Sequence, residues 1–398
     1  MTLIDRRFDD PVIEVAAQSP RLEMLMTRLR HAGMRPIPVT TVAANSPDDP
    51  VLIDLATAPD AMPAAQTRLT ITLGDTQANT KGDIHLSNIN LLHTLPARMA
   101  IRKREQTRQR EADRRTRTAQ RLGLSTRQSA TKAAPRLLWL GQNAAFLNPL
   151  KSALKSAGVD LVAALSRLTA EDYLAKGGFD AVIVYPSTAG DEASQLLARY
   201  VKADHAPKTK LVLLTSPETS ASIETGRLDN VDQILDLIND PEKLSRELIA
   251  YAQRHTKTAP KTNRLTATIR EQGTKLASRA FLEAHLETQI QDADASGERL
   301  CLIALNAPDA ATLKRLSETI QPMLRETDLA ARLDKDHICI TMPATPYRGA
   351  VALARRIEAS MDTDINWRVV ERRRFHTLKT LLGGLTAKSH MSLAQKFG

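Results

Sequence analysis

Two residues near the end of the chain have the types and the spacing needed to bind a charged, planar ligand. Arg325 and Asp328 are separated by two residues. A guanidinium can donate paired hydrogen bonds to phosphate oxygens or to two acceptors of a planar base, and a carboxylate can accept from N–H groups. A surface ion pair at a helix end has the same spacing and contributes little stability. Both interpretations remain open from these two residues alone.

The elements that would position functional residues are short apolar runs that alternate with amphipathic helices. Two stretches, residues 11–97 and 136–255, follow this plan. Strand candidates lie at 12–16, 36–39, 51–55, 69–73 and 84–86, and again at 137–140, 159–163, 181–185, 211–215 and 233–235. Short buried strands between helices predict parallel sheets covered on both faces, and five β–α units in order predict a flavodoxin-like α/β fold.

The second stretch resembles response-regulator receiver domains in its spacing and in the run DPEKLSREL after its last strand. In that family, acids after the first strand hold the magnesium ion that allows an aspartate after the third strand to accept phosphate. Asp54 has that position in the first stretch, but residues 16–19 contain no acid. In the second stretch Tyr185 replaces the aspartate, and Leu237 replaces a lysine. We therefore expect two degenerate receiver domains that serve in dimerisation or docking, with Asp54 a vestigial phosphoacceptor.

Residues from about 271 to 375 resemble GGDEF domains, the diguanylate cyclase family. The run SRAFLEAHLE, residues 278–287, matches the opening helix of that family, and residues 327–360 match its central hairpin and the following helix. The resemblance implies a third α/β domain, of the nucleotide-cyclase type. The whole chain then resembles alphaproteobacterial response regulators with two receiver domains and one GGDEF domain.

The hairpin that carries catalysis in this family is altered here. Its positions are occupied by Asp334, Lys335, Asp336, His337 and Ile338 instead of two glycines, two acids and an aromatic residue. Lys335 places a long side chain where bare glycine backbone admits the nucleotide. The preceding strand carries Ala304 and Asn306 where the family has two aspartates, so one metal ligand is missing and the other is weakened. We therefore expect no bound metal, no cofactor and no cyclase activity.

The resemblance also implies a role for Arg325 and Asp328. Asp328 lies six positions before Asp334, which is the register of an inhibitory cyclic di-GMP site in this family. The arginine would donate to O6 and N7 of a guanine, and the aspartate would accept from its N1 and N2 hydrogens. Such a pair would reject adenine, because buried partners would be left unpaired. Arg356 on the next helix is expected to complete the pocket, unless it is a solvated helix charge.

Charge and hydropathy limit the other functions. The net charge is +10, and residues 98–121 hold ten lysines or arginines against three acids. Because this part of the predicted linker 98–135 lacks interleaved aromatic residues, we expect a solvated helix there and no nucleic-acid partner. A second linker is expected at 256–270, and the tail 376–398 should contain an amphipathic helix that packs on its own domain or on a partner. The absence of a long apolar run or a signal sequence predicts a cytoplasmic protein without a membrane span.

These features predict a non-catalytic effector that binds cyclic di-GMP and acts on protein partners, as a homodimer. The resemblance further implies an adaptor that works at the cell pole and helps to deliver cell-cycle regulators to a ClpXP-type protease. Three alternatives from other classes are a scaffold that no longer binds nucleotide, a weakly active cyclase, and a nucleic-acid binder that uses the arginine-rich helix.

Overall fold

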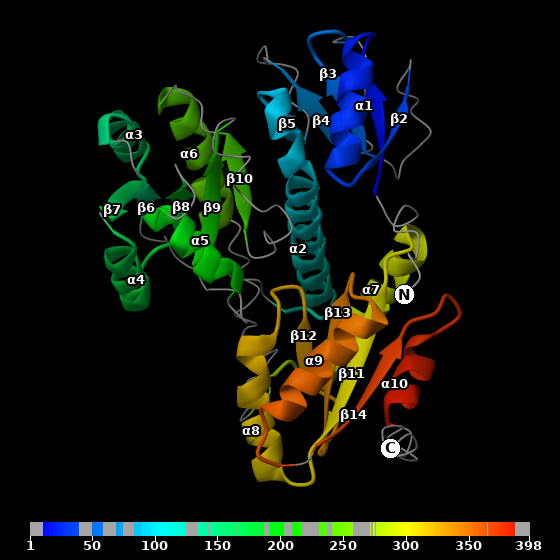
Figure 1. Cartoon of the computed structure of the whole chain (residues 1–398). Helices are drawn as coiled ribbons and strands as arrows, with labels where there is room; N and C mark the ends of the chain where they lie inside the picture. Colours follow the sequence, from blue (N-terminus) through cyan, green and yellow to red (C-terminus); the bar gives the residue numbers. More distant parts are fainter. Residues whose placement is uncertain are drawn as a thin grey trace, which may run out of the picture. The chain divides into compact units, whose positions relative to one another are not determined.

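The computed structural model of the protein describes residues 11–39, 50–58, 69–74, 83–124, 134–141, 144–164, 166–186, 191–202, 209–216, 231–236, 241–257, 271, 274, 276–363 and 365–386. Leu237 and most of the predicted linker 256–270 lie outside these residues. Contacts between residues divide the chain into two compact units. The first contains Met1–Lys103 and Lys132–Ala259, and the second contains Arg104–Thr131 and Pro260–Gly398 (Figure 1).

The first unit contains two five-stranded parallel sheets. The strands of the first sheet are β1 (Val12–Ala16), β2 (Arg35–Pro38), β3 (Val51–Asp54), β4 (Thr70–Leu73) and β5 (Ile84–Leu86), in the order β2-β1-β3-β4-β5. Both β3 and β4 are buried along their whole length, as expected for a sheet that is covered on two faces. Helix α1 (Arg21–His31) packs Leu25 and Leu29 into the core of this domain. The short helix η3 (Ile89–Thr94) leads into α2 (Leu95–Arg121).

The second sheet repeats this topology. Its strands are β6 (Arg136–Gly141), β7 (Asp160–Ala164), β8 (Ala181–Tyr185), β9 (Lys210–Thr215) and β10 (Gln233–Asp236), in the order β10-β9-β8-β6-β7. The helices α4 (Arg167–Lys176) and α5 (Glu192–Lys202) contribute to the apolar core on one face, and α3 (Ala144–Ser156) and α6 (Pro241–Lys257) to that on the other. Counted along the chain, both sheets have the strand order 2-1-3-4-5 of flavodoxin-like folds. The predicted strands agree with the observed ones to within one or two residues.

Arg98, in the first turn of α2, ties the two sheets of the first unit together. Its guanidinium forms an ion pair with Asp236 and donates to Thr215 Oγ1 at 3.3 Å, so it covers the carboxyl ends of β9 and β10. Ser87, directly after β5, donates to Asp236 Oδ2 from its backbone N–H at 2.9 Å and from its hydroxyl at 2.8 Å. The charge of the buried Asp236 is therefore balanced by a residue of α2, which agrees with the rule that buried charges are paired.

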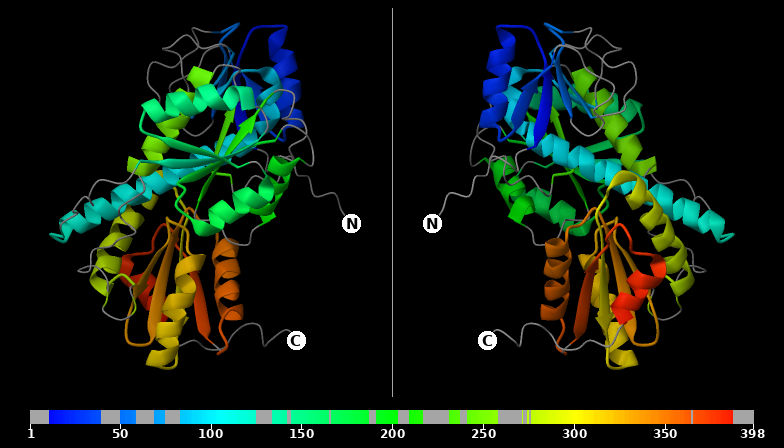
Figure 2. Two further views of the ribbon diagram at one scale, coloured as in Figure 1. Left: turned by 90° about the vertical axis from the view of Figure 1, so that its left-hand side faces the viewer. Right: turned by 90° about the vertical axis from the view of Figure 1, so that its right-hand side faces the viewer.

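The second unit contains an antiparallel four-stranded sheet. Its strands are β11 (Leu300–Asn306), β12 (Leu329–Arg332), β13 (His337–Pro343) and β14 (Asn366–Glu371), in the order β12-β13-β11-β14. The helices α8 (Ala310–Ile320) and α9 (Tyr347–Ala359) share one apolar core with the sheet. The helices α7 (Arg279–Ser296) and α10 (Leu378–Thr386) share the other core, on the opposite face (Figure 2). In α10, Leu381 and Leu385 are buried in that core, so this part of the predicted tail packs on its own domain.

The prediction of a solvated linker helix in the basic segment 98–135 is wrong. The helix forms and continues to Arg121, but from Arg104 onward it belongs to the second unit. The buried residues of this part are Glu111, Arg114, Arg115, Thr118 and Ala119. Their spacing, i, i+3, i+4, i+7 and i+8, defines one face of a helix. That face can be buried although it is polar, because the second unit supplies acids and hydrogen-bond acceptors for its arginines.

Arg114 illustrates how the positive charge of this segment is neutralised. Its guanidinium donates to Asp292 Oδ2 at 2.7 Å and to Glu298 Oε2 at 2.6 Å, and it is also paired with Glu111. Arg114 and Arg115 are only 2 % and 5 % exposed, so neither can contact the phosphates of a nucleic acid in this fold. Among the helices that the structure describes, none is long and apolar enough to cross a bilayer.

Candidate functional site

The turn that carries Arg325 and Asp328 lies between the short helix η7 (Gln321–Met323) and β12. Asp328 is buried, and Arg325 is exposed. The Asp328 Oδ2 atom accepts a hydrogen bond from the backbone N–H of Arg325 at 2.9 Å, and the N–H of Asp328 donates to the Arg325 carbonyl at 3.1 Å. A carboxylate that binds the backbone a few residues away stabilises a tight turn. The two residues that were predicted to bind ligand are thus held in one closed turn.

The carboxylate of Asp328 is in an unfavourable electrostatic environment. Only 6 % of the residue is exposed, and its Oδ1 atom accepts no hydrogen bond from any described residue. Burial raises the pKa of this carboxyl to about 6, although the hydrogen bond from Arg325 and the charges of Arg325 and Arg115 act in the opposite direction. Oδ2 is already bonded within the turn, and Oδ1 is buried without a hydrogen-bond partner among the described residues. A guanine that donates from N1 and N2 would therefore have to expose Oδ1 first.

Arg356 lies beside the same turn. It is in the last turn of α9, and its Nη2 atom donates to the carbonyl of Met323 at 3.2 Å. Met323 is two residues before Arg325, so the guanidinium of Arg356 lies close to the start of the turn. The side chain is exposed. The three residues predicted for a ligand site therefore come from one region, formed by η7, the turn and the end of α9.

The hairpin between β12 and β13 is closed by Asp334. Its Oδ1 atom accepts from the backbone N–H groups of Asp336 and His337, each at 2.9 Å, and lies 2.8 Å from His337 Nδ1. The other ring nitrogen of His337 lies 3.0 Å from the side-chain amide of Asn306. Burial alone would raise the pKa of Asp334, but the hydrogen bonds from Asp336 and His337 and the charge of His337 lower it. His337 is thus held between the turn and the end of β11, and Lys335 is exposed.

The two positions that were predicted to match metal-binding aspartates have different environments. Asn306 is opposite His337 in the β11–β13 register, at the hairpin. Ala304 is opposite Cys339 and is buried in the apolar core with α7 and α10. Of these two residues, only Asn306 is placed beside the hairpin. In the described part of the chain, no group of three or more histidines, cysteines or acids is arranged to hold a metal ion.

Asp54 is completely buried at the end of β3. Its Oδ2 atom accepts from Arg21 Nε at 2.7 Å and from Thr57 Oγ1 at 2.7 Å. A guanidinium is therefore bonded directly to this carboxylate. In the second sheet the equivalent strand end carries Tyr185, whose backbone and Cβ lie so close to Gly141 that a side chain at Gly141 would collide with them.

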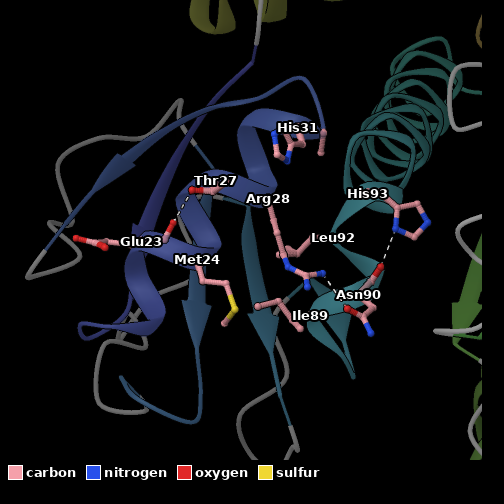
Figure 3. A pocket seen from close by; sticks show the side chains of 10 residues that line it. Glu23, Met24, Thr27, Arg28, His31, Ile89, Asn90, Leu92 and His93 are labelled. Carbon is pink, nitrogen blue, oxygen red and sulfur yellow. Dashed lines mark hydrogen bonds between the residues drawn. The ribbon is translucent and has the colours of Figure 1, made fainter.

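A hollow of about 650 Å³ lies in the first unit between α1 and η3 (Figure 3). Its lining includes the apolar side chains of Met24, Ile89 and Leu92 and the basic groups of Arg28 and His31. Arg28 donates to Asn90 Oδ1 at 2.8 Å across this hollow. None of the residues predicted to be functional line it.

Glu111, Arg115 and His285 were missed by the sequence analysis although they are buried next to the turn. Glu111 Oε1 lies 2.6 Å from His285 Nε2, and Arg115 Nη2 donates to the carbonyl of Asp328 at 3.0 Å. The signal was present but ambiguous. A glutamate and an arginine at i and i+4 on a helix are usually a solvated pair, and nothing in the sequence shows that this face is buried.

Comparisons with known proteins agree with the fold of the second unit. Residues 309–383 match the family described as "Diguanylate cyclase, GGDEF domain". The chain therefore carries a GGDEF domain, which includes the turn, the hairpin and α9. No curated protein matches the chain.

Several solved structures are similar to parts of the chain. The GGDEF domain of DgcB from Caulobacter crescentus, in complex with c-di-GMP, is 12% identical and covers 29% of this chain and 82% of its own, with a TM-score of 0.27. The diguanylate cyclase SiaD from Pseudomonas aeruginosa, in complex with its activator SiaC, is 20% identical. The match covers 36% of this chain and 64% of SiaD, with a TM-score of 0.28. An orphan response regulator of H. pylori is 14% identical over 30% of this chain and 98% of its own, with a TM-score of 0.25.

Proposed function

We propose that the chain is a non-catalytic effector that binds cyclic di-GMP through Arg325, Asp328 and Arg356. The observation that carries this proposal is the state of Asp328 within a GGDEF domain. Its carboxylate is buried, and one oxygen has no hydrogen-bond partner among the described residues. The N–H donors of a guanine would supply that partner, and the exposed guanidiniums of Arg325 and Arg356 would meet the phosphates or the other edge of the base.

The hairpin supports a role without catalysis. Diguanylate cyclases need an open glycine backbone for the nucleotide and acids for two magnesium ions. Here Lys335 takes one of these positions, and His337 is held by Asp334 and Asn306. Asp336 alone would have to hold the metal that balances the charge of a transferring phosphoryl group. We propose that the two flavodoxin-like domains are receivers that have likewise lost phosphorylation, because Asp54 of the first is bonded to Arg21 and the second has Tyr185 at the equivalent position.

The finer role follows from the resemblance to alphaproteobacterial regulators such as PopA. We propose that the ligand-bound chain, as a homodimer, acts as an adaptor that brings cell-cycle regulators to a ClpXP-type protease at the cell pole. A protein that changes its surface on binding a ligand must bind that ligand differently in two conformational states. This requirement makes ligand binding the first step to test.

The test is calorimetric titration of the full chain with cyclic di-GMP. We expect the wild type to bind, and Arg325→Ala to bind at least tenfold more weakly, since hydrogen bonds to charged groups contribute about 1.5–3 kcal/mol. Arg355→Ala is the matched control, because Arg355 is an exposed arginine next to Arg356 on α9, and it should change the affinity by less than about twofold. Absence of binding by the wild type would leave a scaffold. Cyclic di-GMP formed from GTP and Mg²⁺, and lost in Asp336→Asn, would instead identify a cyclase.

A further inference from the structure

The turn with Arg325 and Asp328 is held from outside the residues of the matched GGDEF domain. Helix α2 provides two contacts to it within the second unit. Arg115 Nη2 donates to the carbonyl of Asp328 at 3.0 Å, and Arg108 Nε lies 3.5 Å from Glu326 Oε2. One contact is to the main chain of the binding aspartate, and the other is to a side chain inside the turn. The local geometry of the turn therefore depends on how α2 is docked.

Arg115 is itself fixed by a buried network around Glu111. Glu111 accepts from Gln289 Nε2 at 3.2 Å, lies 2.6 Å from His285 Nε2 and is paired with Arg115 at 3.4 Å. Burial would raise the pKa of Glu111, but the charge and hydrogen bond of His285 and the charges of Arg115 and Arg114 lower it. Its charge is thus retained inside the unit, where it holds α2 against α7. Removing one partner from such a network leaves an uncompensated buried charge.

The arrangement links α2 to Asp328 Oδ1, the oxygen of this carboxylate that has no hydrogen-bond partner among the described residues. Arg115 binds the Asp328 carbonyl, Asp328 Oδ2 binds the Arg325 N–H, and Oδ1 is left unbonded in the described structure. A ligand donor at Oδ1 would stabilise the ionised carboxylate in this position. The ionised carboxylate is also attracted to the nearby guanidinium of Arg115, which acts on its charge. Docking of α2 through Arg115 therefore fixes the main chain of the residue to which a donor at Oδ1 would bind.

We propose that Arg115 is a positioning residue for the ligand-binding turn, and that cyclic di-GMP binding and the docking of α2 stabilise each other. This inference rests on the proposed ligand site. Such a coupling is reciprocal, so the ligand must tighten α2 by the same factor by which docked α2 tightens the ligand. The consequence reaches beyond the site, because the first turns of α2, with Arg98, belong to the other unit.

The experiment compares Arg115→Met with Arg121→Met in the full chain. Methionine keeps most of the aliphatic stem of arginine and removes the donors. Arg121 is the control, because it lies on the same helix, is about half exposed and pairs only with Glu287 on the surface among its described contacts. In titrations with cyclic di-GMP, Arg115→Met should weaken binding by about tenfold or more, and Arg121→Met by less than about twofold. Wild-type affinity in a folded Arg115→Met variant would overturn the inference and leave the proposed function intact.

Hydrogen exchange of the wild type gives a second measurement that needs no variant. Saturating cyclic di-GMP should slow amide exchange in residues 104–121, since a ligand can only stabilise the conformation to which it binds better. Unchanged exchange in this segment, with binding confirmed by calorimetry, would overturn the coupling even if Arg115→Met does not fold. No heat of binding with the wild type would instead overturn the proposed function, and this inference with it.

Discussion

Replacing Asp328 with asparagine should stabilise the second unit at neutral pH. Burial raises the pKa of this carboxyl to about 6 in the folded chain, against 3.8 for the free group. Between these values the folded protein still holds a proton that the unfolded chain has released, so stability falls as the pH rises through this window. An amide does not titrate there, and its oxygen can still accept from the Arg325 N–H. The variant therefore avoids a cost that the wild type accumulates as the pH rises from about 4 to about 6 and carries in full above that range.

The size of the effect follows from the two pKa values. A difference of about two pKa units corresponds to about 3 kcal/mol once both states are ionised. The unfolded chain is already largely ionised at about pH 4.5, which accounts for about 1 kcal/mol of this cost. The stability of Asp328→Asn relative to the wild type should therefore increase by about 2 kcal/mol between about pH 4.5 and about pH 7.5. A constant offset from the buried amide N–H₂ would cancel in that comparison.

Urea unfolding followed by tryptophan fluorescence measures this difference. The chain has two tryptophans, Trp139 in the first unit and Trp367 on β14 in the second. In a Trp139→Phe background, the signal of Trp367 reports on the second unit. Asp336→Asn is the control, because the side chain of Asp336 is 41 % exposed and should be hydrated in both states. A free-energy difference between Asp328→Asn and the wild type that is the same at both pH values would refute the reasoning.

Four further outcomes are expected. The affinity for cyclic di-GMP should fall about tenfold per pH unit below about pH 6, because the ligand needs the ionised form of Asp328; a flat titration series would contradict this. Arg98→Met should lower the free energy of unfolding of the first unit by about 3–5 kcal/mol, because it leaves Asp236 buried without its cation. The double variant Arg98→Met with Asp236→Asn should lower it much less. Denaturation with Trp139 as the reporter measures both changes. Gly141→Ala should lower the free energy of unfolding of the first unit by about 1–3 kcal/mol, because the new Cβ would lie 2.9 Å from Tyr185 Cβ. By contrast, the Cβ of Gly384→Ala in α10 would meet no atom within 4 Å, so this variant should raise the thermal midpoint. Acetyl phosphate with Mg²⁺ should not phosphorylate Asp54, since the residue is completely buried and Arg21 and Thr57 bind its Oδ2 atom, and an added phosphoryl mass on Asp54 would show this wrong.

The sheets of the first unit could be predicted from sequence because each strand is a run of buried apolar residues with polar ends. The run VLID becomes β3, buried at all four positions, and AVIVY becomes β8. In such a sheet the local pattern and the tertiary environment agree, so a reading of hydrophobicity alone is sufficient. The strand order also follows, since five short β–α units have few ways to close a doubly wound sheet.

Helix α2 shows where this reasoning fails. Its helical character was predicted, but its burial was not. The buried positions carry glutamate, arginine and threonine, which are the residues of a solvated helix face. Their burial is decided by partners far along the chain, such as His285 and Asp292, and a sequence pattern cannot show which charges will meet.

The candidate site residues were chosen by type and register, but their burial and hydrogen bonds could be described only from the fold. Arg325, Asp328 and Arg356 lie in one region as expected, whereas nothing in the sequence indicated that Asp328 would be buried with one unbonded oxygen. A turn that only joined η7 to β12 could use an uncharged side chain at this position and avoid the cost of about 3 kcal/mol that ionisation of the buried carboxyl carries. A charge that is costly in the free protein, next to exposed arginines and held by a residue of α2, favours a turn that is completed by a ligand with N–H donors. Both the energetic cost of burying Asp328 and the affinity for the ligand then depend on whether Oδ1 has a hydrogen-bond donor.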